Sequence, residues 1–292
     1  MKEKSIQKRL NGRAWLFVIP SLILIVAFVF YPMVQAFLTS FQTGVANNLK
    51  FGGVANYQRL LTDSTFQKAL FNTVLFLLVQ VPVMILLALA ISSMLNNKKL
   101  KCRGLFRTAI FLPCVTSLVA YSIIFKSLFA NDGFVNGILM NLHLISQPIN
   151  WLTSTGFARL LIIIAITWRW TGYNMIFYLS GLQSIDDSIY EAASIDGATG
   201  FQKFRYMTLP LLKPIILFTT INSTIGTLQL FDEPMNITQG GPANTTITIS
   251  QYIYNLLFKY QPNFGYAAAV SFVIVVLIVV LSFIQLKVGD KE

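Results

Sequence analysis

The sequence predicts an all-α integral membrane protein with six transmembrane helices and cytoplasmic termini. Two observations on composition and one on pattern lead to this fold class. Of the 292 residues 55% are hydrophobic and 11% are charged, whereas about a quarter are charged in a soluble domain. Mean hydropathy is +0.64. Six segments are apolar over the roughly 20 residues that a bilayer-spanning helix needs: residues 15–38, 70–95, 105–129, 160–183, 211–231 and 266–286.

These segments define the domain organisation that we expect. Residues 1–14 form a basic cytoplasmic N-terminus, residues 15–286 a six-helix transmembrane domain with a cytoplasmic loop at 184–210, and residues 287–292 a cytoplasmic tail. The first span contains Pro20 and Pro32, which suit helix ends or kinks. A basic start before an apolar run is also typical of a signal peptide, but this run is too long and no good cleavage site follows it.

The distribution of Lys and Arg predicts the orientation. Basic residues gather before the first span, around the connection between the second and third spans, around that between the fourth and fifth, and after the sixth. Fewer lie in the connections on the other side. Both termini are therefore expected in the cytoplasm. The net charge of +11 indicates topology and contact with anionic lipid rather than nucleic-acid binding.

Several chemical functions have no support in the sequence. There is no P-loop motif, so we expect no ATP hydrolysis by this chain. His143 is the single histidine, and Cys102 and Cys114 have no neighbouring histidine, so neither a metal site nor a disulfide framework is expected. We expect no enzyme activity and no cofactor bound by this chain.

The loop at 184–210 carries helix signals. Ser184 and Asp187 fit a capping box, Gly197 is a helix stop, and Thr199 and Gln202 fit a second capping box. Two short helices would thus meet at an elbow near Gly197. The pattern alone leaves two interpretations open, in which the elbow either holds another protein or lies on lipid headgroups.

Beyond the fifth span, the turn at 239–242 precedes apolar residues at helical spacing from Ile249 to Tyr260. We expect an amphipathic helix that either lies on the outer bilayer surface or docks a partner.

Polar side chains inside the fourth and fifth spans mark a candidate site, because such groups are costly in lipid. An amide–glycine–amide face beside aromatic rings suits a sugar, since amides bind hydroxyls and rings cover apolar sugar faces. For any one residue, contact between helices is the simpler interpretation. Arg169 could pair with Asp232 or Glu233, or meet an anionic substrate. The candidate substrate-binding residues are Arg169, Trp170, Tyr173, Asn174, Asn222, Gly226, Gln229 and Asp232.

The loop motif resembles the EAA loop of permease subunits in binding-protein-dependent ABC importers. The residues that carry this resemblance are Tyr190, Glu191, Ala192, Ala193, Asp196, Gly197, Leu209 and Pro210. Stretches around Asn56-Tyr57 with Phe66, residues 172–174 through 181–183, and residues 238–242 resemble the maltose and multiple-sugar branch, nearer its compact six-span members such as the glycerol-3-phosphate and lactose permeases. The resemblance covers nearly the whole chain.

The resemblance implies a type I importer permease fold in a bacterial cell membrane. The eight loop residues would couple to two partner ATPase subunits, which bind the ATP and Mg²⁺. A second, homologous permease subunit would complete a heterodimer, and an extracytoplasmic solute-binding protein would deliver a di- or oligosaccharide. Asn222, Gly226 and Gln229 stand where maltose-type subunits have Ser and Asn, which argues against maltose itself. An anionic substrate (uronide, sialic acid or glycerol phosphate), an ion-coupled secondary carrier and a membrane scaffold are the alternatives.

Overall fold

The computed structural model describes residues 15, 17–46, 48–97 and 99–289. It divides into two compact units, which we describe separately. Unit 1 is Met1–Thr62 with Asn255–Phe272, and unit 2 is Asp63–Tyr254 with Val273–Glu292. The basic N-terminus predicted for residues 1–14 and the tail residues 290–292 lie outside the described residues.

Unit 1 contains the first apolar helix, which runs from Phe17 to Ser40. Its π-helical turn η1 (Val26–Phe30) leads into α2 (Tyr31–Ser40), which has a proline in its first turn. A two-stranded antiparallel ribbon, β1 (Gln42–Thr43) and β2 (Lys50–Phe51), is followed by α3 (Ala55–Thr62). The π-helical turn η4 (Asn255–Lys259) and the start of α13 (Phe264–Gly289) complete the unit.

Polar contacts hold unit 1 together at its connections. The Asn56 side-chain amide on α3 donates to the carbonyl oxygens of Ser40 at 2.9 Å and Gln42 at 2.7 Å. A side chain at Gly265 would place its Cβ 1.8 Å from the Gln42 carbonyl oxygen, so α13 can start here only with glycine. The first apolar helix buries none of its apolar window inside the chain, as expected for a helix whose surroundings are lipid or another subunit.

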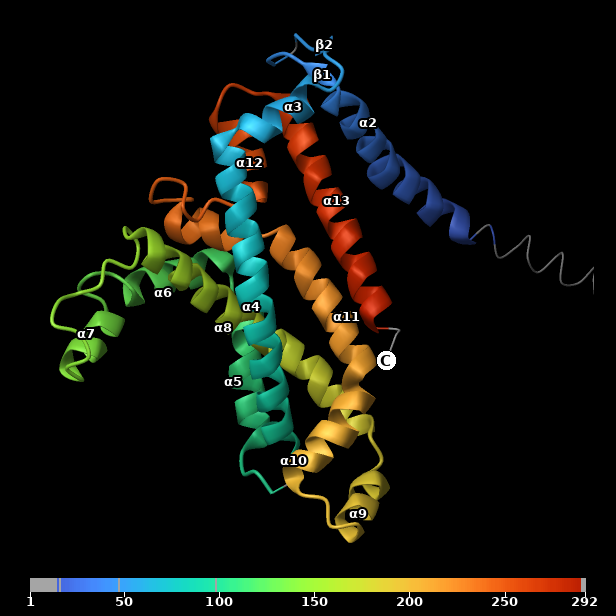
Figure 1. Ribbon diagram of the computed structural model, residues 1–292, viewed down its shortest axis with the longest axis vertical. Coiled ribbons are helices and arrows are strands. Elements are labelled where there is room, and N and C mark those ends of the chain that lie inside the picture. Colours follow the sequence, from blue (N-terminus) through green and yellow to red (C-terminus); the bar gives the residue numbers. More distant parts are fainter. Residues whose placement is uncertain (1–14, 16, 47, 98, 290–292) are drawn as a thin grey trace, which may run out of the picture. The chain divides into compact units, whose positions relative to one another are not determined.

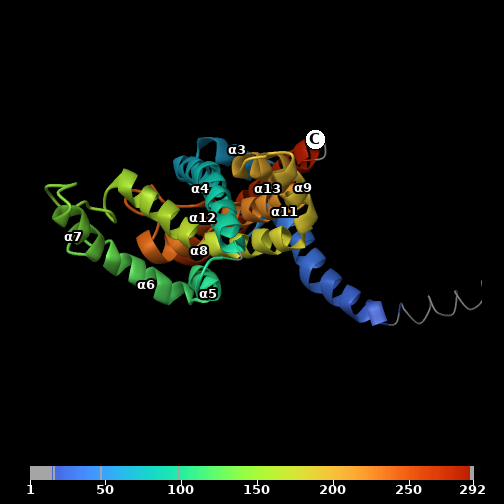
Figure 2. The same ribbon diagram turned by 90° about the horizontal axis from the view of Figure 1, so that it is seen from below.

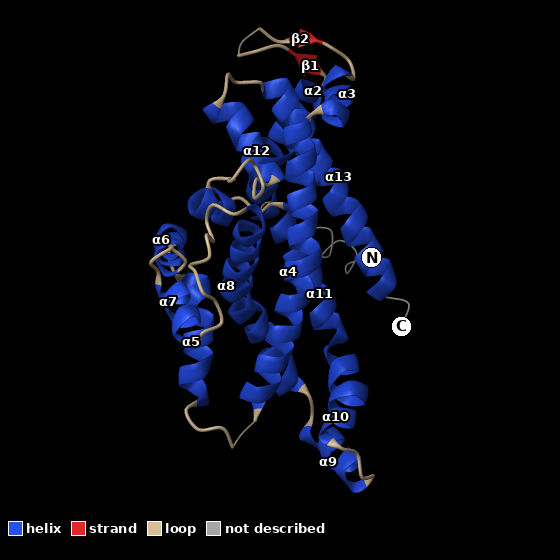
Figure 3. Cartoon of the chain, turned by 60° about the vertical axis from the view of Figure 1, so that its left-hand side comes forward, coloured by secondary structure: helices blue, strands red, loops and turns tan. Residues whose placement is uncertain are grey.

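Unit 2 holds the remaining elements. They are α4 (Ser64–Asn96), α5 (Arg103–Val115), α6 (Leu118–Leu128), α7 (Phe134–Asn141), α8 (Thr155–Ser184), α9 (Asp187–Ile195), α10 (Gly200–Lys203), η2 (Phe204–Thr208), α11 (Leu209–Leu228), η3 (Pro234–Thr238), α12 (Ile249–Tyr254) and the end of α13. Within the described residues every element of unit 2 is helical (Figure 3).

The core of unit 2 lies where α4, α8 and α11 pack on one another, with α5 along α8 (Figure 1). Met175, Tyr178 and Leu212 are among the fully buried side chains there. Helices α5 and α8 approach closely at Gly172, where an added Cβ would lie 2.0 Å from the Ile110 carbonyl oxygen. A glycine is thus required at this crossing.

Five helices of the described residues are long and apolar enough to cross a membrane, and they correspond to predicted spans one, two, four, five and six. The third predicted span, residues 105–129, forms as a bent pair of helices that together are long and apolar enough to span a membrane. Helix α5 ends at Val115 and α6 starts at Leu118, with a bend of 102° between them (Figure 2). Thr116 and Ser117 have extended or near-extended ψ angles of 150° and 131°, which interrupts the helix although hydropathy continues across it.

The predicted amphipathic helix from Ile249 to Tyr260 forms as α12 followed by η4. The apolar face of α12 neither lies on the bilayer surface nor is free to dock a partner. Ile249 and Tyr252 are buried within unit 2, where the backbone N–H of Ile249 donates to Thr73 Oγ1 at 3.2 Å. Packing against α4 therefore covers this face from inside the chain.

Candidate functional site

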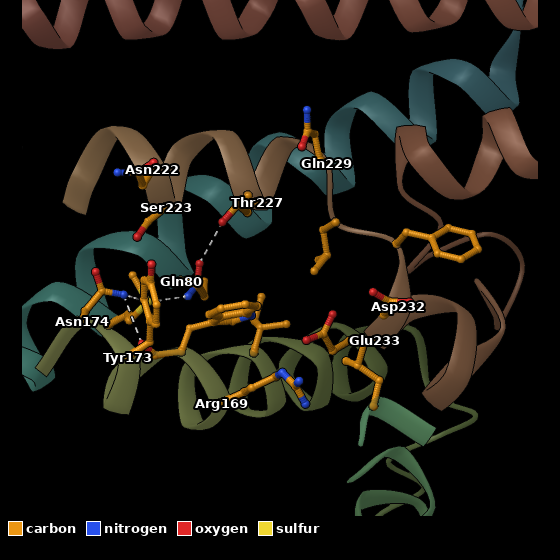
Figure 4. A pocket seen from close by; sticks show the side chains of 17 residues that line it. Gln80, Arg169, Tyr173, Asn174, Asn222, Ser223, Thr227, Gln229, Asp232 and Glu233 are labelled. Atoms are coloured by element: carbon orange, nitrogen blue, oxygen red, sulfur yellow. Dashed lines mark hydrogen bonds between the residues drawn. The ribbon is translucent and has the colours of Figure 1, made fainter. Parts of the chain in front are cut away.

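A cavity of about 470 Å³ lies between α4, α8, α11 and the segment that follows α11 (Figure 4). This volume is within the range of about 300–1,000 Å³ that small-molecule sites occupy. All eight substrate-binding residues predicted from sequence line it. The other lining residues are Gln80, Met84, Leu118, Ile166, Ser223, Thr227, Leu230, Phe231 and Glu233.

Helix α11 contributes the amide–glycine–amide face. Asn222 and Gln229 are exposed and Gly226 has open space beside it, so the face is accessible from the cavity. The fifth span was predicted to reach residue 231, but α11 ends at Leu228 and Gln229 is its C-cap, with φ −96° and ψ 9°. The carboxylate-bearing segment from Asp232 to Glu233 therefore turns back along the cavity instead of continuing the helix.

Helix α8 contributes the aromatic wall. The Trp170 and Tyr173 ring centroids are 5.8 Å apart with planes at 88°, and both rings are about two-fifths exposed. One turn later, Asn174 is buried. Its amide nitrogen donates to the Trp170 carbonyl oxygen at 3.1 Å, while its Oδ1 has no hydrogen-bond partner among the described residues. The rings of Trp170 and Tyr173 and the amide of Asn174 thus line the same cavity.

Ser223 and Thr227 belong to the polar residues of the fifth span, whereas Gln80 of α4 was not identified from the sequence. Gln80 is 2% exposed, and its Oε1 accepts a hydrogen bond from Thr227 Oγ1 at 3.1 Å. This bond joins residues 147 positions apart. An amide in the middle of the mostly apolar span 70–95 was the available signal, because polar groups in spans usually face a cavity or a partner helix.

Of the two carboxylates considered for Arg169, Glu233 is the buried one, whereas Asp232 is partly exposed. Arg169 and Glu233 are nearly fully buried, at 6% and 3% exposed. Glu233 lies beyond the end of α11, where burial raises its pKa to about 7 and the guanidinium of Arg169 acts in the opposite direction. Figure 4 shows both groups on one side of the cavity, with Asn222 and Gln229 on the other.

The predicted elbow forms at the opposite end of α8, but its first cap differs from the prediction. The capping box at Ser184 and Asp187 is wrong, because α8 continues through Ser184, whose hydroxyl donates to the Gly181 carbonyl oxygen. Asp186 caps α9 instead, accepting from the Ser188 backbone N–H at 2.9 Å. This bond lowers the pKa of the exposed Asp186 carboxyl.

The turn between α9 and α10 follows the sequence signals. Gly197 has φ +75° and donates to the Ser194 carbonyl oxygen, while Ala198 donates to that of Ala193, as in a Schellman motif. The second capping box is confirmed, since Thr199 and Gln202 exchange both expected hydrogen bonds.

Most of the eight predicted coupling residues lie on the elbow surface. Glu191, Ala192, Asp196, Gly197 and Pro210 are exposed, Tyr190 and Leu209 partly so. Ala193 is buried within the elbow, so its side chain supports packing there. Beside these residues, the apolar side chains of Ile195 and Phe201 are 87% and 75% exposed.

Residues 84–290 match the family described as "Binding-protein-dependent transport system inner membrane component". The lactose transport system permease protein of Rhizobium radiobacter is 58% identical over 96% of this chain and 95% of that protein. The arabinooligosaccharides transport system permease protein of Bacillus subtilis is 35% identical over 95% of this chain and 88% of that protein.

Among solved structures, a bacterial ABC transporter involved in the import of the acidic polysaccharide alginate has a chain that matches with a TM-score of 0.81. The match covers 98% of this chain and 99% of that chain at 24% identity, which shows the fold. The fold is therefore that of a type I ABC importer permease. The chain belongs to the inner membrane components of binding-protein-dependent transport systems, in the branch whose named relatives are sugar permeases.

Proposed function

We propose that this chain lines half of the sugar path of an ABC importer and that its substrate is a neutral di- or oligosaccharide. One observation carries the proposal: the cavity combines the amides of Asn222, Gln229 and Asn174 with the rings of Trp170 and Tyr173. Amides exchange hydrogen bonds with hydroxyls, and aromatic faces cover the apolar faces of a pyranose. The named lactose and arabinooligosaccharide relatives support this substrate class.

The exposed amide face supports a second permease subunit as partner. Asn222 and Gln229 contribute to the cavity yet are exposed in the single chain, as expected if a homologous subunit closes the path. Large apolar surfaces of the spans, including Leu78 at 67% and Leu86 at 68% exposed, are left for lipid or that subunit.

The elbow supports two ATPase subunits as the source of energy, one on each permease subunit. The fixed turn at Gly197 presents Glu191 and the exposed apolar side chains of Ile195 and Phe201 together. Exposed apolar groups on a rigid turn are typical of a protein-docking surface. ATP and Mg²⁺ would bind to those subunits, and an extracytoplasmic solute-binding protein would deliver the sugar. The elbow and both termini would then face the cytoplasm.

The test is reconstitution of the chain with its partner subunits and binding protein in liposomes. ATP-dependent uptake of a neutral disaccharide is expected, and it should stop when ATP or the binding protein is omitted. Sugar uptake by this chain alone, driven by an ion gradient, would instead support a secondary carrier. Family membership favours the ABC importer over that alternative.

A further inference from the structure

Two opposite charges from different segments are buried in the same cavity. Arg169 comes from the middle of α8, and Glu233 comes from the segment after α11, 64 positions later. Burying a single charge in a weakly polar environment is costly, and an opposite charge nearby offsets part of the cost. Each of these two buried charges therefore offsets part of the cost of burying the other.

The guanidinium of Arg169 is held by groups at the end of α5 and on α6. Its Nη2 donates to the carbonyl oxygens of Cys114 at 3.4 Å and Thr116 at 3.3 Å, which α5 leaves without helical partners where it ends. The Tyr121 ring lies 5.2 Å from the guanidinium carbon. The break in the third span thus fixes the position of Arg169.

Both groups keep unused hydrogen-bonding capacity beside the cavity. Nε and Nη1 of Arg169 and Oε1 of Glu233 are buried without a hydrogen-bond partner in the described part of the chain. Figure 4 shows the guanidinium and the carboxylate on the same side of the cavity. One side offers donors only and the other, when ionised, acceptors only.

A sugar hydroxyl both donates and accepts, so neighbouring hydroxyls can accept from Arg169 and donate to Glu233 at the same time. A carboxylate on a sugar can only accept, and it would be repelled by Glu233. Asp232 lines the same cavity and adds a second acidic group, which disfavours an anion further. The arrangement thus matches an uncharged, polyhydroxylated ligand better than a carboxylated one.

We propose that Glu233 is a specificity-determining residue that balances the charge of Arg169, so that the cavity prefers uncharged sugars over carboxylated ones. The proposal rests on the proposed function. It also assigns to Arg169 a role in binding hydroxyls instead of an anion.

The test is direct sugar binding to the purified, assembled complex, measured by titration calorimetry. The probes are a panel of neutral disaccharides, including lactose, and the counterpart of each in which one CH₂OH is oxidised to a carboxylate. Glu233→Gln is expected to shift the ratio of the two dissociation constants about tenfold or more towards the acidic sugar, as for a charge-assisted hydrogen bond. The Arg169→Gln/Glu233→Gln double variant should reverse that gain. Asp132→Asn, which makes the same chemical change at an exposed position before α7, should leave the ratio unchanged.

A second measurement needs no variant and applies even if Glu233→Gln does not assemble. The raised pKa of Glu233, about 7, means that its carboxylate takes up a proton as pH falls through that value. The groups around it are Arg169 on α8, the adjacent Asp232 and Tyr121 on α6. A protonated Glu233 no longer repels a carboxylate, so wild type should bind the acidic sugar relatively better at pH 6 than at pH 8.

The outcomes separate the two proposals. If no neutral disaccharide binds to the wild-type complex, the proposed function fails and the role of Glu233 fails with it. If a neutral sugar binds but Glu233→Gln leaves the ratio of the two dissociation constants unchanged, the role of Glu233 alone is refuted. If that variant does not assemble, an unchanged ratio between pH 6 and pH 8 in wild type refutes that role.

Discussion

The hydroxyls of Tyr190 and Thr208 are hydrogen-bonded at 2.8 Å, which joins α9 to the π-helical turn η2 across the elbow. Tyr190 is the first residue of the EAA-type motif, and Thr208 is buried next to the start of α11. The bond therefore ties the surface that we assign to ATPase docking to the helix that carries Asn222. A movement of the elbow would reach the cavity through this connection.

Tyr190→Phe removes this bond and keeps the ring. Because a single hydrogen bond contributes about 1 kcal/mol, we expect sugar uptake per ATP hydrolysed to fall several-fold while the complex still assembles. Uptake and ATPase rates measured in the same liposomes give the ratio. Thr208→Val should lower sugar uptake per ATP hydrolysed to the same extent, and the double variant should show no further decrease. A wild-type ratio in both single variants would exclude the connection.

Gly197→Ala tests the turn between α9 and α10. No atom lies within 4 Å of an added Cβ, so the cost is confined to the backbone at φ +75° and should be about 1 kcal/mol. We expect reduced stimulation of the ATPase by the loaded binding protein, with a smaller effect in Gly197→Asn, since Asn tolerates this conformation.

The bulky substitution Gly197→Trp should abolish uptake while the assembled complex still binds the solute-binding protein. Co-purification with that protein and uptake in liposomes are the two measurements. Intact transport in this variant would refute the proposal that the elbow couples to the ATPase subunits.

Gly172→Ala should destabilise the packing of α5 on α8. Its Cβ would meet the Ile110 backbone carbonyl, which cannot rotate away, so overpacking should cost about 1–3 kcal/mol or more. A lower melting temperature of the purified complex is expected. The matched control is Gly137→Ala in α7, where an added Cβ meets nothing within 4 Å and stability should be unchanged or slightly higher. Equal melting of both variants would contradict the close crossing.

Asn222→Ala and Gln229→Ala test the amide face. Both side chains are exposed in the chain, so we expect normal assembly but weaker sugar binding, by about fivefold to tenfold for one lost hydrogen bond. Titration with a neutral disaccharide is the measurement. Unchanged binding and uptake in both variants would favour the scaffold interpretation over transport through this cavity.

Local signals in the sequence predicted several elements with their boundaries. The capping box of Thr199 and Gln202 and the stop at Gly197 depend on residues at most a few positions apart, so they can be recognised without tertiary structure. The cap at Asp186 was missed because α8 includes Ser184, the residue expected to cap the next helix, and Asp186 two positions later takes that role.

The candidate site was predictable in part because some of its residues lie a few positions apart on one helix. Asn222, Gly226 and Gln229 share a face at helical spacing, and Trp170 and Tyr173 follow the same rule on α8. Gln80 could not be assigned from its own surroundings, since its partner Thr227 lies on another helix.

By itself, the sequence determined the membrane class, the apolar segments of the spans and the elbow, because hydropathy and capping act over a few turns of one segment. Only the tertiary structure decided where the third span breaks, which carboxylate faces Arg169 and what covers α12. The physical reason is that these features depend on which groups another segment leaves unsatisfied. The carbonyls at the end of α5 accept from Arg169, and Arg169 and Glu233 line the same cavity, which no single helix forms.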